Sequence, residues 1–144
     1  MKVTLILFVL FFEQTVWAES RDDICESMVP KGKLVEKDGR EYKIKTRAGT
    51  RITVELYRNG KLEEASGKNL NRGDDFEPGQ GLISLTTAAQ AATIPGINLE
   101  TRWSLDHDKK LGWIYEFNGE HKGVETDILV DARNGKVILN HEDL

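Results

Sequence analysis

Residues 50–62, TRITVELYRNGKL, contain the pattern that decides the fold. Three apolar residues, Ile52, Val54 and Leu56, alternate with polar ones. Successive side chains of a β-strand point to opposite faces of a sheet, so the alternation predicts a strand with one buried and one exposed face. Asn59-Gly60 follows, which is typical of a tight hairpin turn and predicts that the next strand runs antiparallel.

The same alternation, interrupted by Gly-containing turns, extends to both sides of this stretch. The segments predict two antiparallel meanders, each with one apolar face. The expected fold class is therefore α+β, with a helix packed on an antiparallel β-meander that is preceded by a second, related β-meander. The expected strands lie at residues 33–37, 42–46, 50–56, 62–65, 99–105, 111–117, 124–130 and 136–139.

A helix is expected between the two groups of strands. Residues 85–92 place one Leu and three Ala at the spacing of a single helical face. Ser84 is a candidate N-cap, and Pro95-Gly96 ends the pattern. The short alanine side chains make this face flat, so the helix can lie close to a sheet. Asp22–Met28 is a candidate second helix, beginning at Asp22 or Asp23; without it the first half lacks a helix.

The N-terminus has the layout of a secretory signal peptide. Lys2 precedes an apolar run over residues 3–12, and Val16 and Ala18 stand at −3 and −1 of a cleavage after Ala18. The run is shorter than the roughly 20 residues that span a bilayer, so we expect a periplasmic or secreted bacterial protein without membrane contact after cleavage. The expected organisation is signal peptide 1–18, N-terminal meander 19–66, linker 67–81 and second domain 82–144.

The charges exclude one class of partner. The chain has 20 Lys and Arg against 24 Asp and Glu, a net charge of −4, and the two signs are interspersed. Without a basic stripe to neutralise phosphates, nucleic acid is not an expected partner. Cys25 is the single cysteine, so it is buried, free or paired between chains, and its acidic neighbours disfavour a thiolate.

No constellation of residues predicts catalysis, and no cofactor is expected. The three histidines, His107, His121 and His141, match no zinc-binding spacing. A small-ligand or metal sensor remains as an alternative function, because Asp106 and Asp108 flank His107 and the loop over residues 67–81 is rich in polar residues.

The second half resembles the PepSY domain, a module named after peptidase propeptides and a spore-germination protein. The similarity covers residues 83–139 and comprises four pieces in the family's order. Asn134 stands where the family usually has Thr, a change that a turn tolerates. The matching pieces are the Ala-rich helix 85–92, the stop Ile94-Pro95-Gly96, the strand Trp113–Phe117 and the ending Leu129–Val137.

The first half looks like a degenerate second copy of the same module. Residues 41–44 echo residues 114–117, with Tyr42 matching Tyr115. The two strands that follow end alike in Asn-Gly-Lys plus an aliphatic residue, at 59–62 and 134–137.

The resemblance implies a non-catalytic module that modulates or inhibits another exported protein, for example a peptidase. Trp103, Trp113 and Tyr115 are the candidate partner-binding residues, as an aromatic patch on an open sheet face. The competing interpretation places them in the core under the helix. Asp131, Asn134 and Gly135 are interpreted as a turn-forming motif, since Asp131 can cap its own turn and Gly135 can adopt φ > 0.

Overall fold

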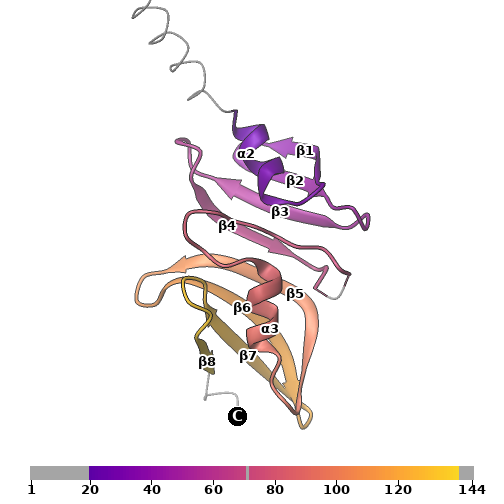
Figure 1. The fold of residues 1–144 in the computed structure, drawn as a ribbon, viewed down its shortest axis with the longest axis vertical. Coiled ribbons are helices and arrows are strands. Elements are labelled where there is room, and N and C mark those ends of the chain that lie inside the picture. The colour runs from indigo at the N-terminus through magenta and orange to yellow at the C-terminus, as the bar shows by residue number, and fades with distance from the viewer. Residues whose placement is uncertain (1–19, 71, 140–144) are drawn as a thin grey trace, which may run out of the picture.

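The computed structural model describes residues 20–70 and 72–139, and the expected signal peptide 1–18 lies outside them. Within this part of the chain there are two helices and one eight-stranded antiparallel sheet, so most of the regular structure is β. Both helices lie on the same side of the sheet (Figure 1).

The first half consists of one helix and four strands. Ser20 caps the helix, because its hydroxyl accepts a hydrogen bond from the Asp23 amide at 3.2 Å. The candidate helix over Asp22–Met28 is confirmed, but it begins at Arg21 rather than at Asp22 or Asp23. These two acids lie in the first turn, where a negative charge interacts favourably with the helix dipole. The elements are α2 (Arg21–Met28), β1 (Lys33–Asp38), β2 (Glu41–Lys45), β3 (Arg51–Leu56) and β4 (Leu62–Gly67).

The second half repeats this order of elements. Its helix begins after Ser84, whose hydroxyl accepts from the Thr87 amide at 3.2 Å, as the sequence predicted. All four predicted strands are present. Between the third and the fourth strand of this half, the Asp131 amide donates a hydrogen bond to the Lys136 carbonyl. The elements are α3 (Leu85–Ala92), β5 (Ile97–Asp108), β6 (Gly112–His121), β7 (Val124–Asp131) and β8 (Val137–Leu139).

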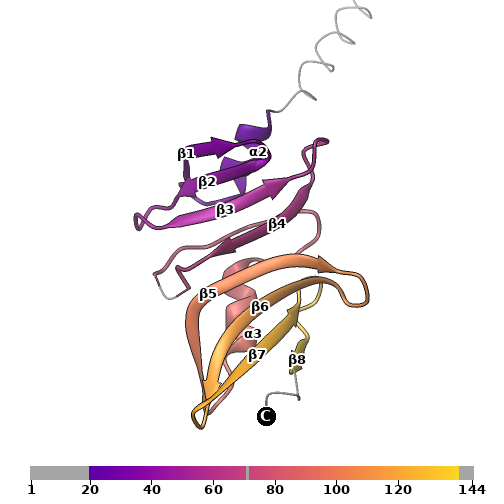
Figure 2. The same cartoon turned by 180° about the vertical axis from the view of Figure 1, so that it is seen from behind.

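The two meanders join into a single sheet through β4 and β5. Ser66 pairs with Ser104 and Gly67 with Trp103, so the strand order follows the chain from β1 to β8 (Figure 2). Gly67 is required at this junction. A Cβ atom there would lie 2.5 Å from the Asn69 Oδ1 atom and 2.7 Å from the Trp103 Nε1 atom.

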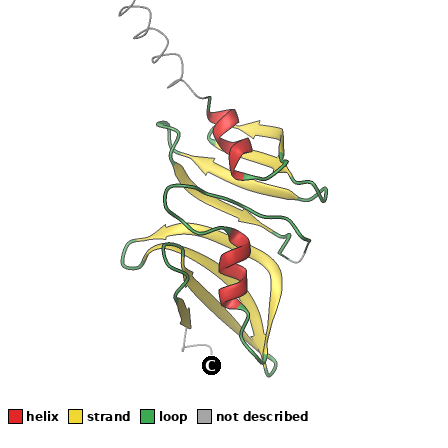
Figure 3. Cartoon of the chain, in the orientation of Figure 1, coloured by secondary structure: helices red, strands yellow, loops and turns green. Residues whose placement is uncertain are grey.

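The apolar core lies between the sheet and the two helices. Strands β2 and β3 bury every second side chain, as their alternating sequences predict. Helix α3 contacts β6 and β7, and its Ala88 and Ala92 side chains are fully buried. Helix α2 contacts β1 and β2 through Cys25 and Met28. No helix of the described residues crosses the opposite face of the sheet (Figure 3).

The connection between the halves packs against both of them. Phe76 is fully buried and its ring centroid lies 5.4 Å from that of Trp103. The Asp74 carboxylate accepts from the Thr46 and Thr50 hydroxyls, each at 2.8 Å, in the turn between β2 and β3. Burial alone would raise the pKa of Asp74, but these hydrogen bonds lower it. The segment expected as a linker therefore holds the first meander in place.

Candidate functional site

The sheet face that no helix covers presents a regular array of polar side chains, which we call the open face. Its members alternate along each strand with the buried residues, as the pleat of a strand requires. The open face comprises Glu41, Lys43 and Lys45 of β2, Arg51, Thr53 and Glu55 of β3, Glu64 and Ser66 of β4, Lys68 directly after β4, Arg102, Ser104 and Asp106 of β5, and Glu116 and Asn118 of β6.

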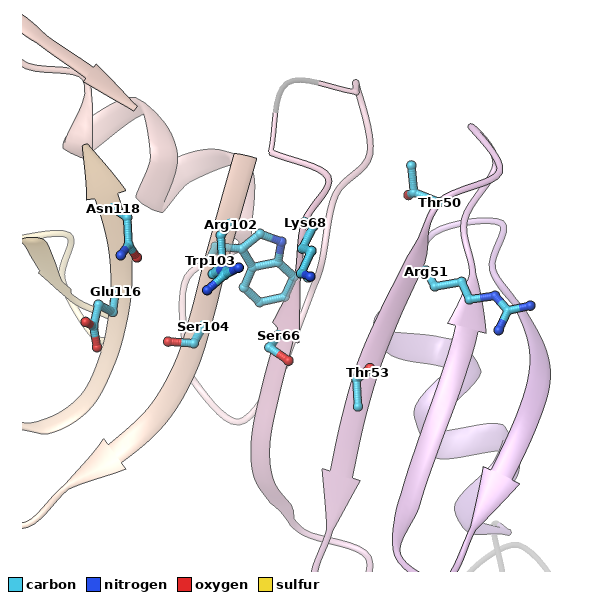
Figure 4. A pocket seen from close by; sticks show the side chains of 11 residues that line it. Thr50, Arg51, Thr53, Ser66, Lys68, Arg102, Trp103, Ser104, Glu116 and Asn118 are labelled. Carbon is cyan, nitrogen blue, oxygen red and sulfur yellow. The ribbon is translucent and has the colours of Figure 1, made fainter. Parts of the chain in front are cut away.

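The middle of the open face is hollowed where the two halves meet. The hollow has a volume of about 770 Å³ and lies over β3 to β6. Lys68, directly after β4, and Arg102 of β5 both line the hollow, whereas the Arg51 guanidinium points away from them (Figure 4). Ser66 and Ser104, a paired position of β4 and β5, line its floor.

The register of the strands sorts the charges of the open face into rows. Glu41 pairs with Glu55, and Glu55 pairs with Glu64. Asp106 lies opposite Glu64, because the adjacent residues Leu105 and Ala65 pair with each other in antiparallel strands. We call these four the acidic row.

Two further rows run parallel to the acidic row. Thr53 pairs with Ser66, and Ser66 with Ser104, which gives a hydroxyl row in the middle. Lys43, opposite Thr53, and Glu116, opposite Ser104, stand at the two ends of this row. The third row consists of bases, and we call it the basic row. Lys45 pairs with Arg51, and Lys68 lies opposite Arg102, one position beyond the pair of Gly67 and Trp103. Its members are Lys45, Arg51, Lys68 and Arg102.

Like charges in the acidic row affect one another. A hydrogen bond with Glu55, partial burial and the charge of Glu55 raise the pKa of Glu64 above its ordinary value. Burial, followed by the charges of Asp127 and Asp106, raises the pKa of Glu116 at the edge of the hollow. Neighbouring carboxylates thus make ionisation of Glu64 and of Glu116 less favourable.

Two of the three candidate partner-binding aromatics are buried in the core. Trp103 is 1 % exposed and Tyr115 is 0 % exposed, while Trp113 is half-buried. The Trp103 Nε1 atom donates to the Asn69 Oδ1 atom at 2.8 Å, and the Tyr115 hydroxyl donates to the Ile83 carbonyl at 2.8 Å. The prediction of an exposed patch is corrected for these two residues, because the connection and helix α3 cover the face of the sheet from which they project.

The motif Asp131, Asn134 and Gly135 lies in the turn between β7 and β8. The Asp131 carbonyl accepts from the Gly135 amide at 2.8 Å, and Gly135 has φ +77°. The Asp131 carboxylate accepts from the backbone and the guanidinium of Arg133, which lowers its pKa. The Asn134 side chain accepts from the Lys136 amide at 2.8 Å. These polar groups are occupied within the turn.

The residues considered for a metal sensor have separate surroundings. Asp106 belongs to the open face, the His107 ring packs edge-on against Trp113, and the Asp108 carboxylate accepts from the amides of the following turn. Within residues 20–70 and 72–139, no three His, Cys, Asp or Glu side chains are grouped to hold a metal ion. His141 lies outside the described residues.

Cys25 is fully buried in the core. Burial, reinforced by the charge of Asp22, raises its pKa to about 12, so the thiol stays protonated at neutral pH. Neither α2 nor α3, the helices of the described part, has the length and apolar character needed to cross a bilayer.

Comparison with known proteins gave no relative. No protein-family model, curated protein or solved structure matches the chain. The function is therefore inferred from the geometry of the open face. In the sequence the acids and bases are interspersed, and the rows become visible only once the strand register is known.

Proposed function

We propose that the protein is an exported, non-catalytic PepSY-like module that modulates or inhibits another exported protein, for example a peptidase. The partner docks on the open face. The observation that carries this proposal is an eight-stranded sheet with one face packed on helices and the other uncovered and hollowed over β3 to β6. A sheet face held rigid from behind is a suitable platform for a partner, because little conformational entropy is lost when the partner binds.

Internal duplication supports the PepSY-like part of the proposal. Each half has a helix followed by four antiparallel strands, and Ser20 and Ser84 cap the two helices in the same way. Tyr42 and Tyr115, which match in sequence, are both fully buried. We propose that both halves are copies of one unit in which the helix packs on the meander.

The size of the open face suits a protein partner. Eight strands spaced about 4.8 Å apart span roughly 34 Å, and strands of about six residues extend for roughly 20 Å. The resulting area, on the order of 700 Å², is close to the ~800 Å² that each protein contributes to an interface of standard size.

The edges of the sheet are less suited to binding than its face. Strand β1 is interrupted by a bulge between Leu34 and Glu36 and carries four charged residues. Strand β8, at the other edge, has three residues. Short, bulged and charged edge strands prevent the addition of a further strand, so a partner that pairs with an edge is disfavoured.

Affinity capture from an envelope extract tests the proposal. The bait is the exported protein, in three forms: wild type, a face variant with Ser66→Arg and Ser104→Arg, and a control with Thr86→Arg and Gln90→Arg on the exposed side of α3. We expect the wild type and the control to retain one partner that the face variant loses. If that partner is a peptidase, the wild type should also slow its cleavage of a peptide substrate.

The outcome that contradicts the proposal is equally definite. Capture of nothing by the wild type, or of the same proteins by all three forms, would rule out docking on the open face.

The alternative of a small-ligand or metal sensor has a single observation in its favour. A hollow of about 770 Å³ is large enough for a small molecule, but it is open and its floor is polar, whereas most ligand sites are enclosed and apolar. Thermal unfolding with and without divalent metals checks the metal form of this alternative. An unchanged melting temperature for every metal would remove it.

A further inference from the structure

The three rows of the open face have a fixed spacing along the strands. In β3, Arg51 and Glu55 are four residues apart with Thr53 between them. Strand β5 repeats this arrangement with Arg102, Ser104 and Asp106. At about 3.3 Å per residue, the basic and the acidic rows lie roughly 13 Å apart, on either side of the hydroxyls.

The rows are unfavourable for the isolated protein. Like charges directly opposite each other on neighbouring strands destabilise a sheet. Glu55 has an acid on both sides across the sheet, and Lys45 stands opposite Arg51. Exchanging a base and an acid between rows would remove the repulsion without altering any buried residue. A surface arrangement that lowers the stability of the fold, and that packing does not require, is a sign of function.

Compensating charges are present on one side of the face only. Arg40 lies 3.6 Å from Glu55, and Glu36 lies 3.6 Å from Arg51, both on the side of β1. Within residues 20–70 and 72–139, none of the four charged members at the β4–β5 junction forms an ion pair. These four are Glu64, Lys68, Arg102 and Asp106. Two of these four, Lys68 and Arg102, line the hollow.

We propose that the open face recognises an extended segment of a protein partner whose charges have the opposite order. One end of the segment places a carboxylate beside Lys68 and Arg102, and a basic residue four positions along the segment lies beside Glu64 and Asp106. Residues four apart on a strand point to the same side, so one face of the segment reaches both rows. This inference rests on the proposed function and adds the chemistry of the partner.

The hydroxyl row and the signs of the charges define the occupant further. Ser66 and Ser104 can donate to and accept from polar groups in the middle of the segment. A polyanion such as nucleic acid, or an anionic membrane, would satisfy the basic row but be repelled by the acidic row. A segment that carries both signs satisfies both rows, and this requirement fixes its direction on the sheet.

Two synthetic peptides of identical composition test the inference by NMR on the ¹⁵N-labelled protein. Both are acetylated and amidated: EETSTKK has its charges separated, whereas EKTSTKE has one charge of each sign at either end. At about 50 mM salt we expect EETSTKK to shift amide resonances of β3 to β6 around the hollow, and these shifts to vanish in about 0.5 M NaCl. EKTSTKE should bind about fivefold more weakly or not at all.

Protein variants provide the matched control. Lys68→Glu with Arg102→Glu should abolish the response to EETSTKK, whereas Lys109→Glu with Lys136→Glu, at exposed positions outside the open face, should leave it unchanged. Equal responses to the two peptides, no response, or shifts confined to the helical side would overturn the inference. Open-face resonances that move with protein concentration alone would overturn it in favour of a second copy of the chain.

The two proposals fail in different ways. If the capture experiment yields a partner that needs Ser66 and Ser104 while both peptides bind alike, the open face binds a protein and the inferred charge order is wrong.

Discussion

At the scale of single residues, the pairing of β4 with β5 depends on the close approach of the Asn69 and Trp103 side chains to Gly67. Gly67 is the last residue of β4, and the Trp103 indole lies close to its backbone while it donates a hydrogen bond to Asn69. Asn69 is buried, and its carbonyl oxygen satisfies the indole N–H. Because the side chain of Trp103 fills the core beneath both meanders, a shift of this indole disturbs the packing of Phe76 and Tyr115 as well.

Gly67→Ala is therefore expected to destabilise the protein. The added methyl group overlaps the Asn69 and Trp103 side chains, and overpacking of this kind costs about 1–3 kcal/mol. Urea unfolding followed by tryptophan fluorescence measures the loss. Ser66→Ala, one residue earlier on the open face, serves as the control and should change the free energy of unfolding by less than about 0.5 kcal/mol. Equal stabilities of the two variants would contradict the contact.

The matching tyrosines provide a second comparison. The Tyr115 hydroxyl donates to the Ile83 carbonyl, whereas the Tyr42 hydroxyl has no hydrogen-bond partner among the described residues. Tyr115→Phe should cost about 1 kcal/mol of unfolding free energy, and Tyr42→Phe close to none. Chemical denaturation of both variants decides this, and a loss for Tyr42→Phe as large as that for Tyr115→Phe would be inconsistent with the structure.

At the scale of elements, local pattern was sufficient for most predictions. The N-cap Ser84 and the spacing of the alanines predicted α3, and alternation predicted the strands. Helix α2 was harder to predict, because its face has only Cys25 and Met28 buried and its cap, Ser20, comes close after the expected cleavage position. The residues of the acidic row were visible, but their alignment required the register of four strands.

Replacing a buried alanine of α3 by a larger residue tests whether this helix lies close against the sheet. Ala88 is fully buried against the sheet, so Ala88→Leu has no room and should cost about 1–3 kcal/mol of unfolding free energy. Gln90→Leu adds an apolar side chain at an exposed position of the same helix and should be close to neutral. Thermal unfolding by circular dichroism compares the two. Tolerance of both substitutions would mean that α3 does not lie against the strands.

The acidic row predicts a pH dependence of stability. The pKa of Glu64 is raised in the folded state, so its ionised form destabilises the fold at pH 7. Glu64→Gln should therefore increase the free energy of unfolding at pH 7 by about 0.5 kcal/mol. This gain should fade as the pH falls through the folded-state pKa of Glu64, and be absent below the unfolded value of about 4.3.

A matched variant separates this effect from a general loss of charge. Glu77→Gln removes an exposed carboxylate outside the acidic row and should leave stability unchanged at each pH. A gain of the same size in both variants would show that net charge, rather than the row, determines the effect.

At the scale of the whole molecule, the feature that the sequence did not predict is the sheet shared by both halves. The frequency of Gly, Asn and Asp over residues 67–81 predicts a linker there. Burial of Leu70 and Phe76 in that segment, and the pairing of β4 with β5, depend on contacts between residues far apart in the chain. Periodicity detects the two faces of a strand but not its neighbours, so the open face and its hollow could not be found in this way.

The most direct test of the account is photocrosslinking inside the producing cell. Benzoylphenylalanine is placed at Ser104, in the middle of the open face, or at Gln90, on the exposed side of α3. A partner that docks on the open face should give a discrete crosslinked species from position 104 and none from position 90. A crosslinked partner from position 90 alone, or none from either position, would contradict a partner-binding open face.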